Sequence, residues 1–185
     1  MDTQQKLSNV TVSLHWIVGL TIITLLVVGI YMEENEVFSL YPIHKSVGML
    51  IFLLIIGRVV WRLKNGWPEP ASQYKAIEHK LAKLTHWVLI VGTLAMPLSG
   101  MVMSGVGGHG LNVFGFFELM PMNPDPNEVG AVIAHNESIA KLGHEVHELF
   151  GIIMIVAILL HMAGAFKHHI VDKDGTLRRM LGAHI

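Results

Sequence analysis

Long apolar stretches separated by polar connections dominate the pattern along the chain. Four of these stretches are long and nearly free of charge, and they cover residues 11–31, 42–63, 84–105 and 147–166. A helix that crosses the hydrocarbon core of a bilayer needs roughly 20 mostly apolar residues. The pattern therefore predicts an all-α, integral membrane four-helix bundle, formed as one domain by residues 1–185.

Composition supports a membrane protein and excludes several other classes. Hydrophobic residues make up 52% of the chain and charged residues only 15%, whereas a soluble domain carries about 25% charged residues. The chain has no cysteine, which excludes disulfides, iron–sulfur clusters and c-type haem attachment. The net charge of −1 gives no reason to expect a nucleic-acid partner.

The distribution of basic residues predicts an orientation in the membrane. Eleven of the 13 Lys and Arg residues lie in residues 1–14, 58–83 and 167–185. Lys45 and Lys141 are the other two, and they share the remaining connections with nine of the 14 acidic residues. By the positive-inside rule, we expect a multi-pass membrane protein with both termini in the cytoplasm; in a Gram-negative bacterium the first and third connections would then face the periplasm. The N-terminal residues lack a cleavable signal pattern, so we expect the first span to be retained.

The connection between the third and fourth spans is the longest polar stretch, and it would lie on the periplasmic side. It contains an aromatic patch of Phe114, Phe116 and Phe117. Residues 127–143 are predicted to form a helix on or above the membrane. The loop is either a plain connector or a short cap over the outer end of the bundle.

The spacing of two histidines on the fourth span carries the main functional signal. His147 and His161 are 14 residues apart, which gives about 21 Å along a helix and a rotation about 40° short of four turns. Both side chains therefore face the same side of the bundle, one near each membrane surface. This geometry predicts two haems bound one above the other. His144 competes with His147 but points about 100° away from His161, so we prefer His147.

Depth in the membrane selects the partners of these two histidines. His15 lies near the cytoplasmic end of the first span, at the depth of His161, and His44 begins the second span at the depth of His147. Each pair can therefore share one iron. Ionisable residues inside a membrane are costly and usually functional. Two axial imidazoles leave no open iron position, which favours electron transfer over oxygen binding.

Three further residues at the inner end have more than one interpretation. Arg58 lies 14 residues after His44 and either neutralises a haem propionate or extends its charge to the membrane surface. His86 is a ligand in place of His15, a propionate partner, part of a quinone pocket or a packing residue. His168 follows His161 by about two helical turns. It either exchanges protons with a quinone or lies at the membrane surface beside Lys167.

These motifs occur in a fixed order along the chain. They are Ser13-Leu14-His15-Trp16, Ile43-His44-Lys45-Ser46-Val47-Gly48, Arg58-Val59-Val60-Trp61-Arg62-Leu63, Leu84-Thr85-His86-Trp87, and a last region from His147-Glu148 through His161-Met162-Ala163-Gly164 to Asp172-Lys173-Asp174-Gly175-Thr176-Leu177. Together they resemble the bacterial di-haem cytochrome b561 family, which is related to the cytochrome b subunits of hydrogenases. The resemblance covers essentially the whole chain.

This resemblance implies two haem b groups and electron exchange with a membrane quinone such as ubiquinone. The positions that match the family's axial ligands are His15, His44, His147 and His161. Family members of this size include superoxide oxidases, which pass an electron from superoxide to ubiquinone. An anion is steered by positive potential, yet the first outer loop reads Glu33-Glu34-Asn35-Glu36. The resemblance thus implies electron transfer more directly than it implies superoxide as the donor.

Three functions compete at this point. The leading interpretation is a quinone-linked membrane oxidoreductase, fed by superoxide or by a periplasmic redox protein. The second is a cytochrome b anchor subunit that links a periplasmic dehydrogenase or hydrogenase to the quinone pool. The third is a histidine-based metal transporter, which predicts carboxylates beside the histidines inside the spans. The only such carboxylates are Glu145 and Glu148, at one edge.

Overall fold

Four long helices make up most of the structure, a computed structural model that describes residues 2–185. They are α1 (Asn9–Glu34), α2 (Tyr41–Asn65), α3 (Ala76–Val106) and α4 (Glu137–Ile170). The shorter elements are η1 (Phe38–Leu40), β1 (Leu111–Val113), β2 (Phe117–Met120) and α5 (Thr176–Met180). Each long helix is long and apolar enough to cross a membrane. The predicted class, an all-α membrane bundle of four helices, is confirmed.

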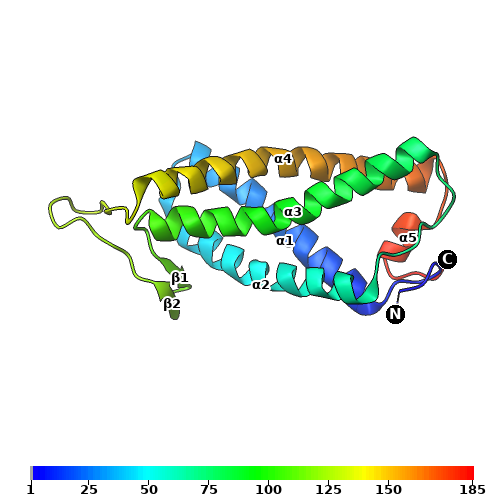
Figure 1. Ribbon diagram of the computed structural model, residues 1–185, viewed down its shortest axis with the longest axis horizontal. Helices are drawn as coiled ribbons and strands as arrows, with labels where there is room; N and C mark the ends of the chain where they lie inside the picture. Colours follow the sequence, from blue (N-terminus) through cyan, green and yellow to red (C-terminus); the bar gives the residue numbers. More distant parts are fainter. Residues whose placement is uncertain (1) are drawn as a thin grey trace.

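The helices run along the long axis of the molecule (Figure 1). The first described residues, the C-terminus and α5 lie at one end of the bundle, which we call the terminal end. The antiparallel hairpin of β1 and β2 and the loop that follows it lie at the opposite end, the hairpin end (Figure 1). One end of the bundle is therefore covered by α5 and the terminal segments, and the other by the hairpin and its loop.

All four helices are longer than the predicted apolar spans, and in α1 and α4 a capping side chain rather than hydropathy sets where the helix begins. Ser8 precedes α1, and its hydroxyl oxygen accepts a hydrogen bond from the backbone N–H of Thr11 at 3.3 Å. Asn136 precedes α4 in the same way, accepting from the N–H of Ile139 at 3.0 Å. Such caps satisfy N–H groups that have no partner within the helix.

The predicted helix over residues 127–143 is wrong in its first part. Residues 127–136 are not helical, and the helix that begins at Glu137 continues directly into the span as α4. Pro126 has no N–H to donate, and Gly130 has a φ of 88°, which suits a turn. An isolated bridge between Pro124 and Val132 closes this loop.

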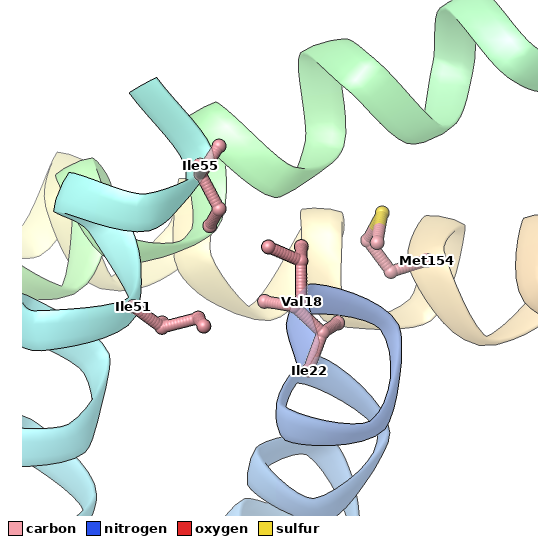
Figure 2. Packing of buried hydrophobic residues seen from close by; sticks show 5 residues of the cluster. All are labelled: Val18, Ile22, Ile51, Ile55 and Met154. Atoms are coloured by element: carbon pink, nitrogen blue, oxygen red, sulfur yellow. The ribbon is translucent and has the colours of Figure 1, made fainter. Parts of the chain in front are cut away.

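The centre of the bundle is a small apolar cluster contributed by three helices. Val18 and Ile22 come from α1, Ile51 and Ile55 from α2, and Met154 from α4, and Figure 2 shows these side chains converging. Each is at most 5% exposed. Most other large apolar side chains of the spans face outward, as expected where lipid rather than water surrounds the helices.

Asp2 ties the N-terminal segment to the terminal end of the bundle. Its carboxylate accepts hydrogen bonds from the Ser8 N–H at 2.8 Å, the Thr11 hydroxyl at 2.8 Å and the Arg62 guanidinium at 3.0 Å. Burial alone would raise the pKa of Asp2, but these hydrogen bonds outweigh it and hold the pKa below its ordinary value. The carboxylate thus joins α1 to α2 in its charged form.

The chain's last residues close the same end. The indole N–H of Trp16 donates to the carbonyl of Met180 at 2.6 Å. The buried Arg179 donates to the carbonyls of Gln4 and Glu69 at 2.8 and 3.0 Å. Helix α5 is therefore held at the terminal end by Trp16, the residue that follows His15.

An Asp2→Asn variant is expected to lower the free energy of unfolding by about 2 kcal/mol, because the hydrogen bonds of Asp2 lose their charged acceptor. Thermal unfolding in detergent, followed by circular dichroism at neutral pH, measures the loss. Because the folded-state pKa is lowered, this stabilisation is complete above the ordinary Asp pKa of about 3.9 and disappears as the pH falls further. The variant and the parent should therefore converge in acid. Equal melting temperatures at neutral pH would contradict the assigned role.

Candidate functional site: histidine pairs at both ends of the bundle

The first histidine pair lies at the terminal end. His15 is in the second turn of α1, and His161 is on the last third of α4. Their ring centres are 6.0 Å apart, with the ring planes inclined by 53°. Residues separated by 146 positions in the chain thus lie next to each other inside the bundle.

The second pair lies at the hairpin end. His44 is in the first turn of α2 and His147 is in the third turn of α4, and their ring centres are 6.4 Å apart. Two glycines face these rings. A Cβ atom on Gly29 would lie 3.4 Å from His44, and one on Gly100 would lie 3.1 Å from His147. The glycine at position 100 therefore leaves room for the imidazole of His147.

Hydrogen bonding orients His147 with one ring nitrogen free. Its Nδ1 lies 2.8 Å from the carbonyl oxygen of Met96. Because a carbonyl oxygen can only accept a hydrogen bond, Nδ1 carries the proton. Nε2 then keeps its lone pair. A histidine that binds a metal through one nitrogen usually donates the other N–H to a carbonyl or carboxylate in this way. His44 differs, because its Nδ1 is buried without a hydrogen-bond partner.

Both pairs fit the donor set of a bis-imidazole haem. Two imidazoles that share one metal ion through bonds of about 2 Å would have ring centres roughly 6 Å apart. The observed separations are 6.0 and 6.4 Å. The unpartnered nitrogen of His44 is an orphaned donor or acceptor that an additional group at the site would explain.

His144, the competitor of His147, makes a different contact. Its Nδ1 lies 3.2 Å from the sulfur of Met103 on α3, whereas His147 faces His44. Of these two candidates, His147 is therefore the one that lies next to His44, as the sequence predicted.

The terminal end has two more polar groups beside the His15 pair. The guanidinium of Arg58 lies 3.1 Å from Nδ1 of His15. The ring of His86, on α3, is 5.2 Å from that of His161. Both residues thus lie at the terminal end, where the sequence placed them, close to the imidazoles.

His168 lies in a polar network beyond the end of the span. Its Nδ1 is 2.7 Å from an oxygen of Asp172, and its ring centre is 4.4 Å from that of Tyr74. Tyr74 in turn donates to Asp174 at 2.6 Å. The hydrogen bond from Lys167, and after it that from His168, hold the pKa of Asp172 below its ordinary value.

A cavity of about 90 Å³ between α2 and α3 was not anticipated from the sequence. It is lined by Ile55, Arg58, Val59, Arg62, Leu63, Trp67, Trp87, Ile90 and Thr93. The indoles of Trp67 and Trp87 lie with their ring centres 5.7 Å apart. The sequence signal was the two tryptophans themselves, because tryptophan is enriched where helices leave the hydrocarbon core.

Comparison with known proteins shows a match to one protein family over nearly the full chain. The model of the family described as "Prokaryotic cytochrome b561" matches residues 6–183. "Cytochrome b561 homolog 2" of Escherichia coli K12 is 26% identical over 186 residues, which cover 98% of this chain and 94% of the relative. "Cytochrome b561 homolog 1" of the same organism is also 26% identical, over 95% of this chain and 97% of the relative.

A third relative carries a more specific name. "Probable superoxide oxidase CybB" of Yersinia pestis is 27% identical over 96% of both chains. The four apolar helices, the histidines at both ends of the bundle and the match over residues 6–183 agree with one another. The chain therefore belongs to the prokaryotic cytochrome b561 family, a family of b-type cytochromes, and is a multi-pass protein of the bacterial inner membrane.

Proposed function

We propose that this protein is a di-haem cytochrome that carries electrons between a periplasmic donor and membrane quinone. His15 and His161 would hold one haem, and His44 and His147 the other. The observation that carries the proposal is the presence of two facing histidine pairs, one at each end of the bundle. When bound, haem supplies reversible one-electron chemistry, and the protein supplies position and surroundings.

The residues between the pairs suit this task. Met154 lies seven residues from both His147 and His161 on α4 and belongs to the buried apolar cluster. This cluster separates the two pairs by an uncharged layer that excludes water. The helical rise places the pairs about 21 Å apart along α4. Electrons can therefore cross most of the bilayer between them, while ions meet an apolar barrier.

The test is a visible spectrum of the purified protein before and after reduction with dithionite, together with a haem assay per chain. Two low-spin b haems per chain are expected. Protein that is folded and fully loaded with a single haem would refute the two-site arrangement. Protein that binds no haem and carries a transition metal on its histidines would favour the transporter interpretation instead.

The proposal includes an orientation, with the terminal end in the cytoplasm and residues 1–185 acting as one domain. It is supported by the clustering of basic residues in segments that lie at the terminal end. A periplasm-dependent reporter is expected to be inactive when fused after Ile185 and active when inserted near Asn123. The reverse pattern would place the acidic hairpin end in the cytoplasm.

Quinone is proposed to react at the terminal end, with His168 as the proton-exchanging group. With Nδ1 donating to Asp172, Nε2 is free to accept a proton from a quinol, and the carboxylate stabilises the resulting imidazolium. The cavity beside Trp67 and Trp87 is the second candidate for the ring, because its walls are largely apolar and it adjoins Arg58. The proposed quinone site is independent of the proposed haem ligands.

A His168→Ala variant is expected to slow quinol-driven reduction of the haems by about 100-fold, the size typical of a lost general base. Stopped-flow absorbance measures the rate, and a haem assay checks that the haem content is unchanged. His169→Ala is the matched control, since His169 is the neighbouring exposed histidine. Unchanged kinetics in His168→Ala would move the reaction to the cavity or to the hairpin end.

The donor is proposed to be superoxide or a soluble redox protein. The name of the Yersinia pestis relative supports superoxide, whereas the exposed Glu33, Glu34 and Glu36 at the hairpin end do not favour an anion. Lys45 adds little there, because its ammonium donates to Ser104 and to the carbonyl of His109. Superoxide-driven quinone reduction that slows at low salt would show repulsion by these acids. A lack of any reaction with superoxide would favour the anchor-subunit alternative.

A further inference from the structure

The β1–β2 hairpin is the feature that electron transfer leaves unexplained. It is held against α2 along its first strand, from Gly110 just before β1 to Phe114 in the turn. The hydroxyl of Ser46, in the second turn of α2, accepts from the backbone N–H of Phe114 at 2.9 Å. Lys45 donates to the carbonyls of His109 and Gly110 at 3.3 and 3.4 Å. The first strand is thus held against the start of α2.

The turn and the second strand of the hairpin expose aromatic and aliphatic side chains. Phe116 is 95% exposed, Phe117 62%, Leu119 60% and Phe114 47%. Glu118 is the single charged residue between Leu111 and Met120. A two-stranded hairpin with three exposed phenylalanines is marginally stable in water, and contiguous apolar patches on a protein usually mark a contact surface.

The direction of the hairpin indicates which surface it contacts. In Figure 1 it lies to the side of the bundle, next to the beginning of α2, whereas the loop that follows it extends along the long axis beyond the helices. That loop contains Asp125, Glu128 and the fully exposed Val129. Because the helices that cross the membrane run along the long axis, a loop that extends beyond them along this axis points away from the membrane. The aromatic hairpin, in contrast, stays at the side of the bundle.

The hairpin packs against α2, whose first turn and the segment before it also expose apolar side chains. Phe38 and Tyr41, at the start of α2, stack with ring centres 6.1 Å apart, and Phe38 is 71% exposed. Ile43, in the first turn of α2, is 50% exposed. Tyrosine and tryptophan are enriched at this depth, and phenylalanine and leucine form the apolar side of segments that lie in the interface.

We infer that the β1–β2 hairpin is an interfacial anchor, which lays Phe114, Phe116 and Phe117 into the lipid headgroup region at the hairpin end of the bundle. The backbone limits its depth. Within residues 2–185 the sheet has only these two strands, so the outer edge of β2 has no strand partner. Such an edge is tolerated among hydrated headgroups but not in hydrocarbon. The occupant is therefore lipid at the interface, and the inference does not depend on the proposed haem or quinone chemistry.

Because the native chain has no cysteine, single cysteines can report depth in the haem-loaded protein. Phe116→Cys is labelled with an environment-sensitive fluorophore and reconstituted into phosphatidylcholine–phosphatidylglycerol vesicles. Val129→Cys, which is fully exposed in the acidic loop, is the water reference. Leu53→Cys, 65% exposed in the middle of α2, is the hydrocarbon reference. The emission maximum at position 116 is expected between the two references, and quenching by a headgroup-attached quencher is expected to be strongest there.

Two outcomes would overturn the inference. An emission maximum at position 116 equal to that of Val129→Cys would place the hairpin in water. A shift at position 116 that disappears when the protein is diluted tenfold in lipid would assign the surface to a second copy of this chain. A shift that persists on dilution supports the lipid contact. Since the side chain of Phe116 is almost fully exposed, its replacement is expected to leave folding and haem content unchanged.

Discussion

A His44→Ala variant is expected to retain one haem per chain and to lose the other. The proposed haem at the hairpin end has His44 and His147 as its two protein ligands, whose rings are 6.4 Å apart in the structure. Removing one imidazole leaves an open iron position and a single protein bond. The proposed haem at the terminal end depends on His15 and His161, about 21 Å away along α4. It should remain low-spin, with an unchanged potential.

His144→Ala is the matched control for this experiment. His144 lies one helical turn from His147 on α4, but it contacts the sulfur of Met103 rather than His44. It should keep both haems. Haem content per chain and the low-spin signals of the oxidised protein measure the outcome in both variants. Two low-spin haems in His44→Ala, or the loss of one in His144→Ala, would show that His44 and His147 are not a ligand pair.

The bundle and the histidine pairing could be predicted because both depend on local periodicity. Apolar length alone defines four spans, and 14 residues is close to a whole number of helical turns. With the alternating direction of the spans, these rules place His15 at the depth of His161 and His44 at the depth of His147. The measured ring separations agree with this pairing.

The features that sequence reasoning missed depend on contacts between distant segments. The hairpin is held by Ser46, and the residues just before it are held by Lys45; both belong to a helix more than 60 residues earlier. The error over residues 127–136 has the same origin, because this polar stretch is shaped by a bridge and by Asn136 rather than by apolar periodicity. Composition alone does not reveal such contacts.

The two histidine pairs also differ in their surroundings, in a way that periodicity does not predict. At the terminal end, Arg58 lies against His15, and His86 lies against His161. At the hairpin end, His147 bonds to the carbonyl of Met96, and Nδ1 of His44 has no partner. A fixed positive charge beside a redox centre stabilises its reduced form. The proposed haem at the terminal end should therefore have the higher potential, and electrons should move toward it from the hairpin end.

An Arg58→Met variant is expected to lower the potential of that haem by about 100 mV. At a separation of roughly 7 Å and an effective dielectric constant of about 20, one unit charge contributes about 2 kcal/mol, or about 100 mV for one electron. A spectroscopic redox titration resolves the two haems, and the haem at the hairpin end should not shift. Arg58→Lys is the matched control, because it keeps the charge and should retain most of the potential. Equal shifts in both variants would show that hydrogen bonding to His15, rather than charge, sets the potential. If neither variant changes the potential of this haem, Arg58 does not set it, and electron transfer toward the terminal end must be driven by other residues of the bundle.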